Sequence, residues 1–397
     1  MLEGVKVVEY ATYMAAPGAG LILSDWGAEV IKIEPPGGDP IRQFFDTIGT
    51  DLKDNPVFDF DNRGKKSVVV DTTKPEGVEI VRKLASEADV FLTNVRPGGL
   101  ERSGLDFPSL AKLNPSLVYC TLTGYGLEGP DKDRPGFDIA SFWSRAGLAR
   151  LFPPKDVDPM LLRTAFGDHV TSIAASSAIN AALVQKFRTG KGQLIEASLL
   201  RAALFSIGSD FAIQLFFDRV ASTKPRAEPT VPIMNYFKSS DDDWICIVAR
   251  QGNVDWPKIC RAAGLEDMAK DERLKSGKGR RAHAAEIVER LDKAFGQYTK
   301  AELAERLDAE QIAWAPVQTL AQVAEDPQVI AAGGIVETPS ISGGTFRAPA
   351  SPVRFPGADD GPKGPAPKLG QHTRELLSRM GVSPSDIDDF YNNGVVQ

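Results

Sequence analysis

Histidine and cysteine are scarce in this chain of 397 residues. The histidines are His169, His283 and His372, and the cysteines are Cys120, Cys246 and Cys260. Neither set has the spacing of a zinc or iron site, so we expect no metal. Because histidine-dependent chemistry is poorly supplied, a mechanism based on carboxylates is favoured. An odd, sparse set of cysteines also indicates a reducing compartment, and we expect a cytoplasmic protein.

Long hydrophobic runs and an excess of positive charge are missing as well. No stretch of eighteen apolar residues occurs, and the first residues form no apolar leader, so we expect no membrane partner. The formal net charge of −7 argues against a nucleic-acid partner, which needs concentrated Lys and Arg. A small anionic ligand remains compatible with this charge, since a few well-placed arginines suffice locally.

The first third of the chain alternates short apolar runs with helical stretches. Strands are predicted at residues 5–10, 29–34, 67–71, 89–93 and 117–123, and helices at 17–26 and from Pro75 onward. Apolar strands separated by helices are typical of a parallel sheet covered on both faces, so the fold class is α/β. Ligands of such sheets bind beyond the carboxyl ends of the strands. The loops after Tyr10, Glu34, Asp71, Thr93 and Thr123 are therefore the candidate site.

The rest of the chain contains a second, smaller unit. A helix at 170–187, a strand at 194–197 and one long apolar helix at 198–217 precede a polar, Pro-rich linker. A strand at 244–248 and helices at 256–263 and 282–295 follow, and Thr299 to Glu302 forms a capping-box pattern. From Pro349 the chain is rich in Pro and Gly and reads as extended. We predict a large domain over 1–221, a small α+β domain over 222–325, and a return to the large domain over 326–397.

Two motifs near the predicted sheet need separate treatment. Gly124 to Gly129 matches G-x-G-x-x-G, but loop-forming residues follow it where a dinucleotide site needs a helix, so NAD binding is not expected. Asp168 precedes an apolar helix. Its carboxylate could cap that helix, or it could be held at the helix start and attack an acyl carbon as a nucleophile. The residue types alone leave both interpretations open.

Several segments together resemble the class III coenzyme A transferases of the CaiB/BaiF type. This family includes formyl-CoA, carnitine-CoA and phenyllactate-CoA transferases and α-methylacyl-CoA racemase. The segments occur in the family's order over nearly the whole chain: LEGVKV (2–7), GAEVIKIEP (27–35), NRGKKS (62–67), ADVFLTN (88–94), GYG (124–126), GP (129–130), GD (167–168), TGKGQ (189–193), APV (315–317), DP (326–327) and LGQHT (369–373).

The resemblance implies a fold, an assembly and a reaction. It implies a Rossmann-like large domain with a smaller domain inserted, and two chains that interlock as a homodimer. It makes Asp168 the nucleophile that transfers CoA from an acyl-CoA to a carboxylic acid, through an aspartyl–acyl anhydride and an aspartyl-CoA thioester. Coenzyme A is then a substrate, and no tightly bound cofactor is expected.

The resemblance also implies which residues contact CoA. The loop after the first strand would line the pantetheine and thioester, and two later loops would meet the adenine and phosphates. Arginine suits this task because its planar guanidinium binds phosphate at several atoms. The residues implied are Tyr13, Met14, Ala15, Ala16, Asp71, Thr72, Thr73, Asn94, Val95, Arg96, Arg102, Phe137 and Asp138.

Departures from the family pattern narrow the reaction. Pro35 stands where some members have a basic residue, and Arg42 is a candidate replacement. The glycine-rich substrate loop of formyl-CoA transferase is missing near residues 249–253, which argues against oxalate. Phe137 replaces the His of the racemases' G-H-D motif and cannot carry a proton. The alternatives are a 2-methylacyl-CoA racemase or epimerase, and a non-catalytic acyl-CoA-binding protein.

The acids exchanged are expected to be medium-sized monocarboxylates with branched or aromatic groups. This expectation rests on the missing loop and on apolar residues assigned to the cleft. Those residues are Phe142, Trp143, Phe152, Ile233, Met234 and Tyr236.

Overall fold

A computed structural model describes residues 1–50, 52, 54–163 and 165–397, and the chain divides into two compact units. The first unit comprises residues 1–149, 161–219 and 330–397, and the second comprises 150–160 and 220–329. The predicted domains differ from this division chiefly at 150–160, which the sequence analysis left in the large domain. Thr223 Oγ1 donates a hydrogen bond to the Leu151 carbonyl oxygen at 2.6 Å, and so ties this segment to the start of the linker.

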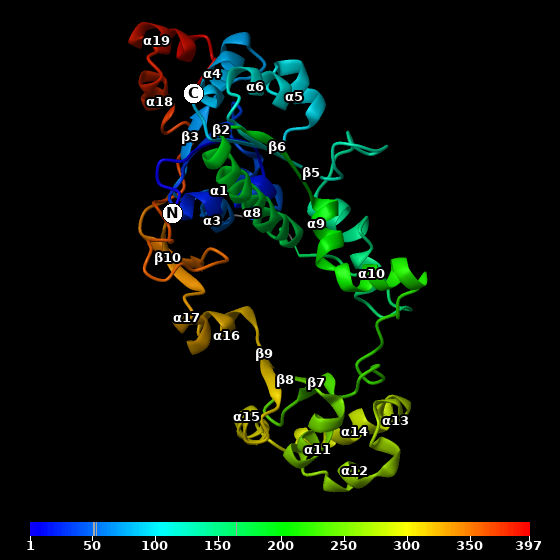
Figure 1. Ribbon diagram of the computed structural model, residues 1–397. Coiled ribbons are helices and arrows are strands. Elements are labelled where there is room, and N and C mark those ends of the chain that lie inside the picture. The colour runs from blue at the N-terminus through cyan, green and yellow to red at the C-terminus, as the bar shows by residue number, and fades with distance from the viewer. Residues whose placement is uncertain (51, 53, 164) are drawn as a thin grey trace. The chain divides into compact units, whose positions relative to one another are not determined.

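The first unit is built on a six-stranded parallel sheet, of which Figure 1 labels β2, β3, β5 and β6. The strand order is β3-β2-β1-β4-β5-β6. The strands are β1 (Lys6–Tyr10), β2 (Glu29–Glu34), β3 (Lys66–Val69), β4 (Val90–Thr93), β5 (Val118–Thr123) and β6 (Gln193–Ser198). The α/β class is therefore confirmed. The direction of winding reverses between β1 and β4, and such a reversal opens a crevice beyond the strand ends.

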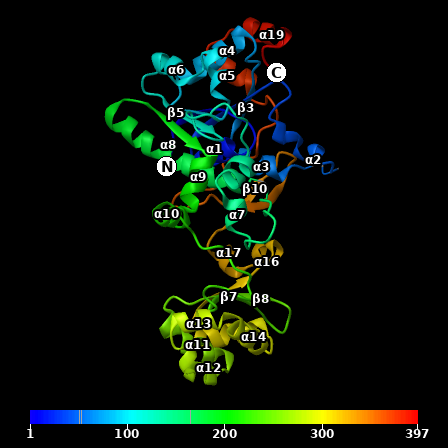
Figure 2. The same ribbon diagram turned by 90° about the vertical axis from the view of Figure 1, so that its right-hand side faces the viewer.

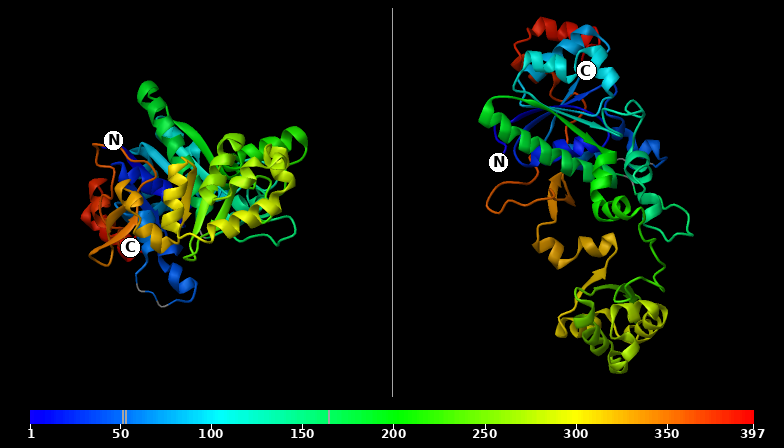
Figure 3. Two further views of the ribbon diagram at one scale, coloured as in Figure 1. Left: turned by 90° about the horizontal axis from the view of Figure 1, so that it is seen from below. Right: turned by 45° about the vertical axis from the view of Figure 1, so that its right-hand side comes forward.

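Helices cover both faces of this sheet. One face packs against α1 (Ala15–Asp25), α8 (Phe166–Thr189) and α9 (Leu199–Ser206), and Figure 3 shows α8, in green, along it. The other face packs against α4 (Pro75–Ser86), α5 (Pro97–Ser103), α6 (Phe107–Leu113), α18 (Thr373–Arg379) and α19 (Pro384–Asn392). The C-terminal segment thus completes the core that the N-terminal segment begins.

Shorter elements complete the first unit. They are a 3-10 helix (Pro40–Gln43), α2 (Phe44–Thr47), α3 (Pro56–Asn62), a π-helical segment (Asp138–Ser144), α7 (Leu148–Leu151) at the boundary between the units, and the antiparallel pair β10 (Ile335–Pro339) and β11 (Thr345–Pro349). The buried Arg63 donates to Asp25, to Thr338 Oγ1 and to the Pro349 carbonyl oxygen. This guanidinium joins the β10–β11 pair to the end of α1.

The single long helix predicted at 198–217 is wrong. The chain forms α9 and then α10 (Gly208–Phe217), and the two axes are bent by 81° at Ile207. Gly208 stands at the break, where a glycine weakens helix continuity. Within the described ranges no single helix is long and apolar enough to cross a membrane, although this bent pair passes that test by length and composition.

The second unit has an antiparallel sheet of β7 (Met234–Lys238), β8 (Trp244–Val248) and β9 (Ala313–Val317). Its helical elements, several visible in Figure 2, are α11 (Gly252–Ala263), α12 (Glu266–Lys270), a 3-10 turn (Glu272–Leu274), α13 (Gly277–Ala282), α14 (Ala284–Phe295), α15 (Lys300–Ala309), α16 (Leu320–Ala324) and, at the boundary with the first unit, α17 (Pro327–Ala331). The predicted capping box is confirmed, since Thr299 and Glu302 exchange hydrogen bonds at the start of α15. The three cysteines are free thiols, and the cytoplasmic location stays a prediction.

Candidate active site

A hollow of about 610 Å³ opens at the carboxyl ends of β1, β4 and β5. This is the edge of the sheet where strand order reverses, as expected for a ligand site in an open parallel sheet. Both charged and apolar side chains line it. They are Tyr13, Ala15, Asn94, Arg96, Pro97, Leu122, Thr123, Gly124, Lys132, Arg134, Gly136, Phe137, Asp168 and Leu199.

Asp168 reaches this hollow from the first turn of α8. The helix enters through Ala165, which has φ 70°, and no side-chain hydrogen bond caps it within the described part of the chain. A β-carbon on Gly167 would lie 2.6 Å from the ring of Phe142, so only glycine allows the helix start to approach so closely. The capping interpretation of Asp168 therefore has no support in the geometry, and its carboxylate faces the hollow.

The surroundings of Asp168 disfavour its charged form. Burial, Asp138 and Asp61 together raise the pKa of Asp168 to about 7, against the opposing effect of His169. The N-terminus of α8 also favours an anion, by ~0.3–1 kcal/mol in exposed cases. Burial likewise raises the pKa of Asp138, although the backbone N–H groups of Ile139, Ala165 and Gly167 hold it down. The Asp168 carboxylate thus exchanges its proton near neutral pH.

Close contact between α1 and α8 fixes the floor of the hollow. The Ser172 hydroxyl lies 2.6 Å from the Ala15 carbonyl oxygen and 2.9 Å from that of Asp168. Gly18 faces it, because a β-carbon there would lie 2.5 Å from Ser172 Oγ. These contacts therefore fix the start of α8 relative to the start of α1.

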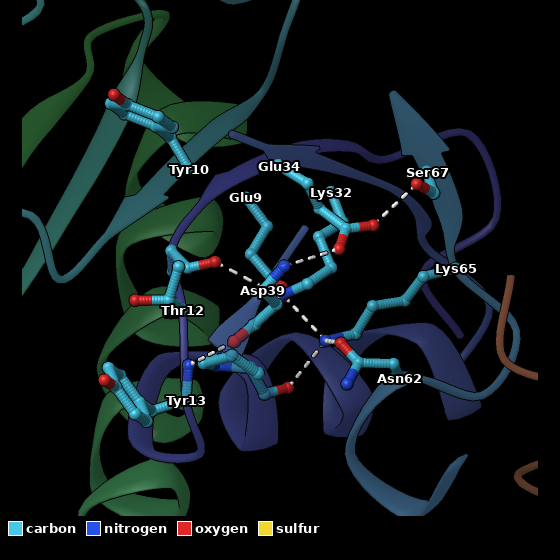
Figure 4. Close-up of polar contacts among 12 residues, drawn as sticks. Glu9, Tyr10, Thr12, Tyr13, Lys32, Glu34, Asp39, Asn62, Lys65 and Ser67 are labelled. Carbon is cyan, nitrogen blue, oxygen red and sulfur yellow. Dashed lines mark hydrogen bonds and ion pairs between the residues drawn. The ribbon is translucent and has the colours of Figure 1, made fainter. Parts of the chain in front are cut away.

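A buried group of charges shapes the loop between β1 and α1. Glu9 accepts hydrogen bonds from Lys32 at 3.0 Å and from Lys65 at 2.8 Å, and all three side chains are fully buried. Lys32 also contacts Asp39 at 2.8 Å, and Asp39 accepts a hydrogen bond from the Tyr13 backbone N–H at 3.0 Å. Figure 4 shows these side chains converging next to this loop. The loop therefore holds Tyr13, with φ 65°, at the hollow.

The same charges shift one another's pKa values. Burial opposes the charge of Glu9, but Lys65 and Lys32 hold its pKa below the ordinary value. Burial also opposes the charge of Lys32, and Asp39, Glu9 and Glu34 hold its pKa above the ordinary value. Burial lowers the pKa of Lys65 to about 8. Ion pairing thus keeps most of this group charged inside the unit.

Six of the residues that the sequence analysis singled out lie around the hollow: Tyr13, Ala15, Asn94, Arg96, Phe137 and Asp168. Asn94 donates to the Thr12 carbonyl oxygen at 2.7 Å and accepts from the Thr12 N–H at 3.1 Å, so its amide also anchors the loop after β1. Arg96 is exposed at the mouth. The rim therefore combines a fixed amide with a solvated cation.

The other candidates lie outside the lining. Met14 and Ala16 are buried in two separate clusters, and Asp138 is buried in the π-helical segment. The remaining five are Asp71, Thr72, Thr73, Val95 and Arg102. Asp71 bonds within its own turn to Thr73, and Thr72 Oγ1 is 2.8 Å from the Tyr10 hydroxyl. Their contacts with CoA stay predictions.

The expected apolar cleft residues and Arg42 are used structurally. Phe142, Trp143 and Ile233 fill hydrophobic cores, whereas Phe152, Met234 and Tyr236 are about half exposed on the second unit. Arg42 grips Glu34 through two hydrogen bonds of 2.7 Å and lies over the ring of Phe58. Its guanidinium therefore stabilises the first unit through these contacts, and it is not among the residues that line the hollow.

The sequence analysis missed Lys132 and Arg134 as lining residues. Lys132 and Arg134 belong to the loop that was set aside with the G-x-G-x-x-G motif. The structure has no helix there, as expected, but Gly124 and Gly136 pack together and fold the loop back over the strand ends. Two cations so near a predicted strand end were the available signal. Among the described residues, no group of three His, Cys, Asp or Glu side chains could hold a metal ion.

Comparisons with known proteins agree along the whole chain. The model of "CoA-transferase family III" matches residues 2–373. The chain is 34% identical over 399 residues, covering all of both proteins, to (R)-2-hydroxy-4-methylpentanoate CoA-transferase of Clostridioides difficile. It is 31% identical to cinnamoyl-CoA:phenyllactate CoA-transferase of Clostridium sporogenes, over 98% of this chain and 96% of that one. A crystal structure of a CaiB/BaiF family protein from Brucella suis superposes with a TM-score of 0.83 at 32% identity, covering 96% and 99% of the two chains.

Proposed function

The chain belongs to family III of the CoA-transferases, and from that premise we propose that it exchanges CoA between carboxylic acids through covalent intermediates on Asp168. The observation that carries this mechanism is the position of one carboxylate. Asp168 is not used as a cap, lies in the first turn of α8, and faces a hollow whose rim bears Arg96, Lys132 and Arg134. A nucleophile and an anion-binding rim thus share one cavity.

The reaction runs in four balanced steps. An Asp168 oxygen attacks the thioester carbon of the donor, the C–S bond breaks, and CoA thiolate leaves an aspartyl–acyl anhydride. The thiolate attacks the Asp168 carbonyl carbon, which releases the donor acid and forms an aspartyl-CoA thioester. The acceptor carboxylate attacks that carbon and expels the thiolate again. The thiolate then takes the new acyl group, and the Asp168 carboxylate is restored with no net proton change.

The start of α1 is suited to stabilise the oxyanions that these steps create. Gly18 N–H already donates to the Met14 carbonyl oxygen at 2.7 Å, and Pro17 has no N–H. Ala15 and Ala16 open the helix, where N–H groups lack intrahelical acceptors. Donors of this kind, aimed at a developing oxyanion, contribute ~3–4 kcal/mol in well-studied enzymes. We assign them this role, and burial of their side chains leaves only backbone to meet the substrate.

CoA is expected to place its phosphates at the basic rim. Arg96, Lys132 and Arg134 are all exposed beside the hollow. Charge-assisted hydrogen bonds to phosphate are the interactions for which such side chains are suited. Arg102 and the turn at 71–73 remain candidates for more distant parts of the same molecule.

The acids are proposed to be medium-sized monocarboxylates with a branched or aromatic group. Two of the relatives carry the names of 2-hydroxy-4-methylpentanoate and phenyllactate. Succinate–glutarate CoA-transferase of Agrobacterium fabrum is also 31% identical, so dicarboxylates belong in any test. The buried positions of Phe142, Trp143 and Ile233 remove part of the original argument. The proposed class of acids is therefore supported more by the names of the relatives than by those side chains.

A racemase or epimerase function would lack the histidine of the G-H-D motif, because Phe137 takes its place at the hollow. Phe137 stands at the mouth and packs edge-on against Tyr13, with ring centroids 5.4 Å apart. A phenyl ring neither accepts nor donates a proton. A binding protein without catalysis would need no nucleophile, and the half-buried carboxylate of Asp168 would then lack a purpose.

The test combines a substrate panel with a chemical trap. Wild-type protein is assayed with acyl-CoA donors and with branched, aromatic, dicarboxylic and oxalate acceptors. Acyl-CoA plus hydroxylamine should convert Asp168 to a hydroxamate that peptide mass spectrometry locates. Asp168→Asn should abolish exchange while CoA binding persists, and Glu76→Gln, at an exposed carboxylate in the first turn of α4, is the matched control. Exchange at the normal rate with Asn at 168, or an adduct elsewhere, would refute the mechanism.

We further propose that two copies interlock as a homodimer of Rossmann-like large domains. The strand order 3-2-1-4-5-6 supports the fold, and an apolar surface on α9 and α10 supports the assembly. Phe205 is 89% exposed and Phe216 is 81% exposed, and α10 buries none of its residues. Exposed apolar patches of this kind mark interaction sites. Sedimentation at nanomolar concentration tests the proposal, and reversible dissociation to monomers contradicts interlocking.

A further inference from the structure

His169 follows Asp168 on α8, and two other helices hold its ring. Its Nε2 atom lies 3.0 Å from Asp61 Oδ1 on α3. The Phe60 ring, also on α3, packs edge-on against it with centroids 5.5 Å apart. On α1, a β-carbon at Gly18 would lie 3.4 Å from His169 Cδ2. These contacts hold the imidazole in one orientation, on the residue that follows the nucleophilic Asp168 in α8.

Asp61 is an unusual partner for a residue on the surface of the site. Its side chain is only 1% exposed, and its Oδ2 atom has no hydrogen-bond partner among the described residues. A buried carboxylate is unfavourable unless a cation compensates it. His169 is 40% exposed and supplies that cation when it is protonated. A contact needed only to join α3 to α8 would not require a charge at this place.

We propose that the imidazolium of His169, held by Asp61, is a positioning residue that keeps the Asp168 carboxylate ionised for attack. The proposal rests on the function given above and adds a residue pair to it. The pair does not touch the substrate. It acts through the charge of Asp168, because an opposite charge nearby favours the ionised form of a carboxylate.

Three carboxylates interact with His169, each from a different part of the fold, and the contact on α1 carries no charge. Asp61 faces it from α3, Asp168 lies beside it on α8, and Asp138 faces it from the π-helical segment. The α1 contact is Gly18, which bears no charge, and Lys65 acts on the far side of Asp61. Burial opposes the charged imidazole, but the three carboxylates raise the pKa of His169 above its ordinary 6.5. The cation is thus present near neutral pH, where Asp168 ionises.

The first experiment measures CoA exchange against pH. The wild-type rate should rise with pH as Asp168 loses its proton. In His169→Asn, that rise should move to higher pH by about one unit, the lower end of the range for a neighbouring opposite charge. Asp61→Asn should move it to higher pH by less than His169→Asn does, because the imidazole loses the anion that retains its proton while Asp168 also loses the repulsion of Asp61. The double variant should move it no further than His169→Asn alone, since both residues act through one pair.

The matched control is His283→Asn in the second unit. His283 also lies beside a carboxylate, with Nδ1 3.4 Å from Glu286, but far along the chain from the nucleophile. Its pH profile should equal that of the wild type. If His169→Asn lowers the rate and leaves the rise at the wild-type pH, the histidine has only a structural role and the proposal is wrong.

A second experiment needs neither an active enzyme nor a histidine variant. With only three histidines, the ring protons of His169 can be followed by NMR in protein labelled at histidine. Reciprocity requires that Asp168→Asn lowers the titration midpoint of His169 by a similar amount. An unchanged midpoint overturns the proposal. A wild-type chain that exchanges no CoA with any acid would instead refute the proposed function, and the NMR result would still decide the pairing.

Discussion

Replacing Asp168 by Asn should make the folded chain more stable while it abolishes exchange. The ionised carboxylate destabilises the folded chain, because burial and Asp138 raise its pKa from 3.8 to about 7. A rise of this size corresponds to ~4 kcal/mol of unfavourable free energy for the charged form. The N-terminus of α8 stabilises the charged form by up to ~1 kcal/mol, and partial solvent access further reduces the unfavourable free energy. We therefore expect Asp168→Asn to gain ~2–3 kcal/mol in unfolding free energy above pH 8.

The sign of the pH dependence follows from proton binding. The folded chain holds the Asp168 proton more tightly than the unfolded chain, so the wild type loses stability as the pH rises from about 4 to about 7. Asn has no such proton. The advantage of the variant should therefore be small near pH 4, less than half complete at pH 5, and full at pH 8.

Denaturant unfolding of both proteins at pH 5 and pH 8 measures this difference. Glu76→Gln is the control, because Glu76 is an exposed carboxylate in the first turn of α4. That change should lose ~0.3–1 kcal/mol at pH 8, since only the helix N-terminus acts on it. If Asp168→Asn instead loses stability at pH 8, or gains the same amount at both pH values, burial is not the cause of the raised pKa of Asp168.

Three further changes test the site and its support. Arg96→Ala should weaken CoA binding by ~1–3 kcal/mol in calorimetry, as expected when a charge-assisted hydrogen bond is lost, and unchanged affinity would remove Arg96 from the site. Gly167→Ala should lower stability by ~1–3 kcal/mol in thermal melting, because its β-carbon would meet the Phe142 ring at 2.6 Å. Asp25→Ala should cost ~3–5 kcal/mol in denaturant unfolding, because it leaves the fully buried Arg63 without its anion. A loss below ~1 kcal/mol would show that solvent reaches that guanidinium.

Elements with a strong local pattern were predictable. β2 and β8 have the predicted bounds, because each is a short run rich in the β-branched residues Val and Ile, with polar or turn residues next to it. The helix break at Ile207 was not predictable from periodicity, since apolar residues continue on both sides. α8 begins at Phe166, four residues before the predicted start, because its first turn packs through Gly167 rather than through an apolar face.

The candidate site was predictable only in outline. The strand ends and Asp168 followed from the alternation of elements and from the resemblance to a family. The two interpretations of Asp168 differ in a hydrogen bond, which no local pattern reports, and the geometry of α8 removes the cap. Lys132 and Arg134 were overlooked because the fold-back of their loop depends on the contact between Gly124 and Gly136.

The sequence by itself determined the order of strands and helices, the parallel sheet and the edge at which a ligand site is expected. These follow from periodicity and from turn residues that act within a few positions of one another. Only the tertiary structure decided which charges meet. Glu9 and Lys32 are far apart along the chain and meet because parallel pairing of β1 and β2 aligns them, and Lys65 joins them from the residue before β3. His169 and Asp61 meet because α3 and α8 both pack against α1, and charge pairing at such distances in sequence leaves no local signature.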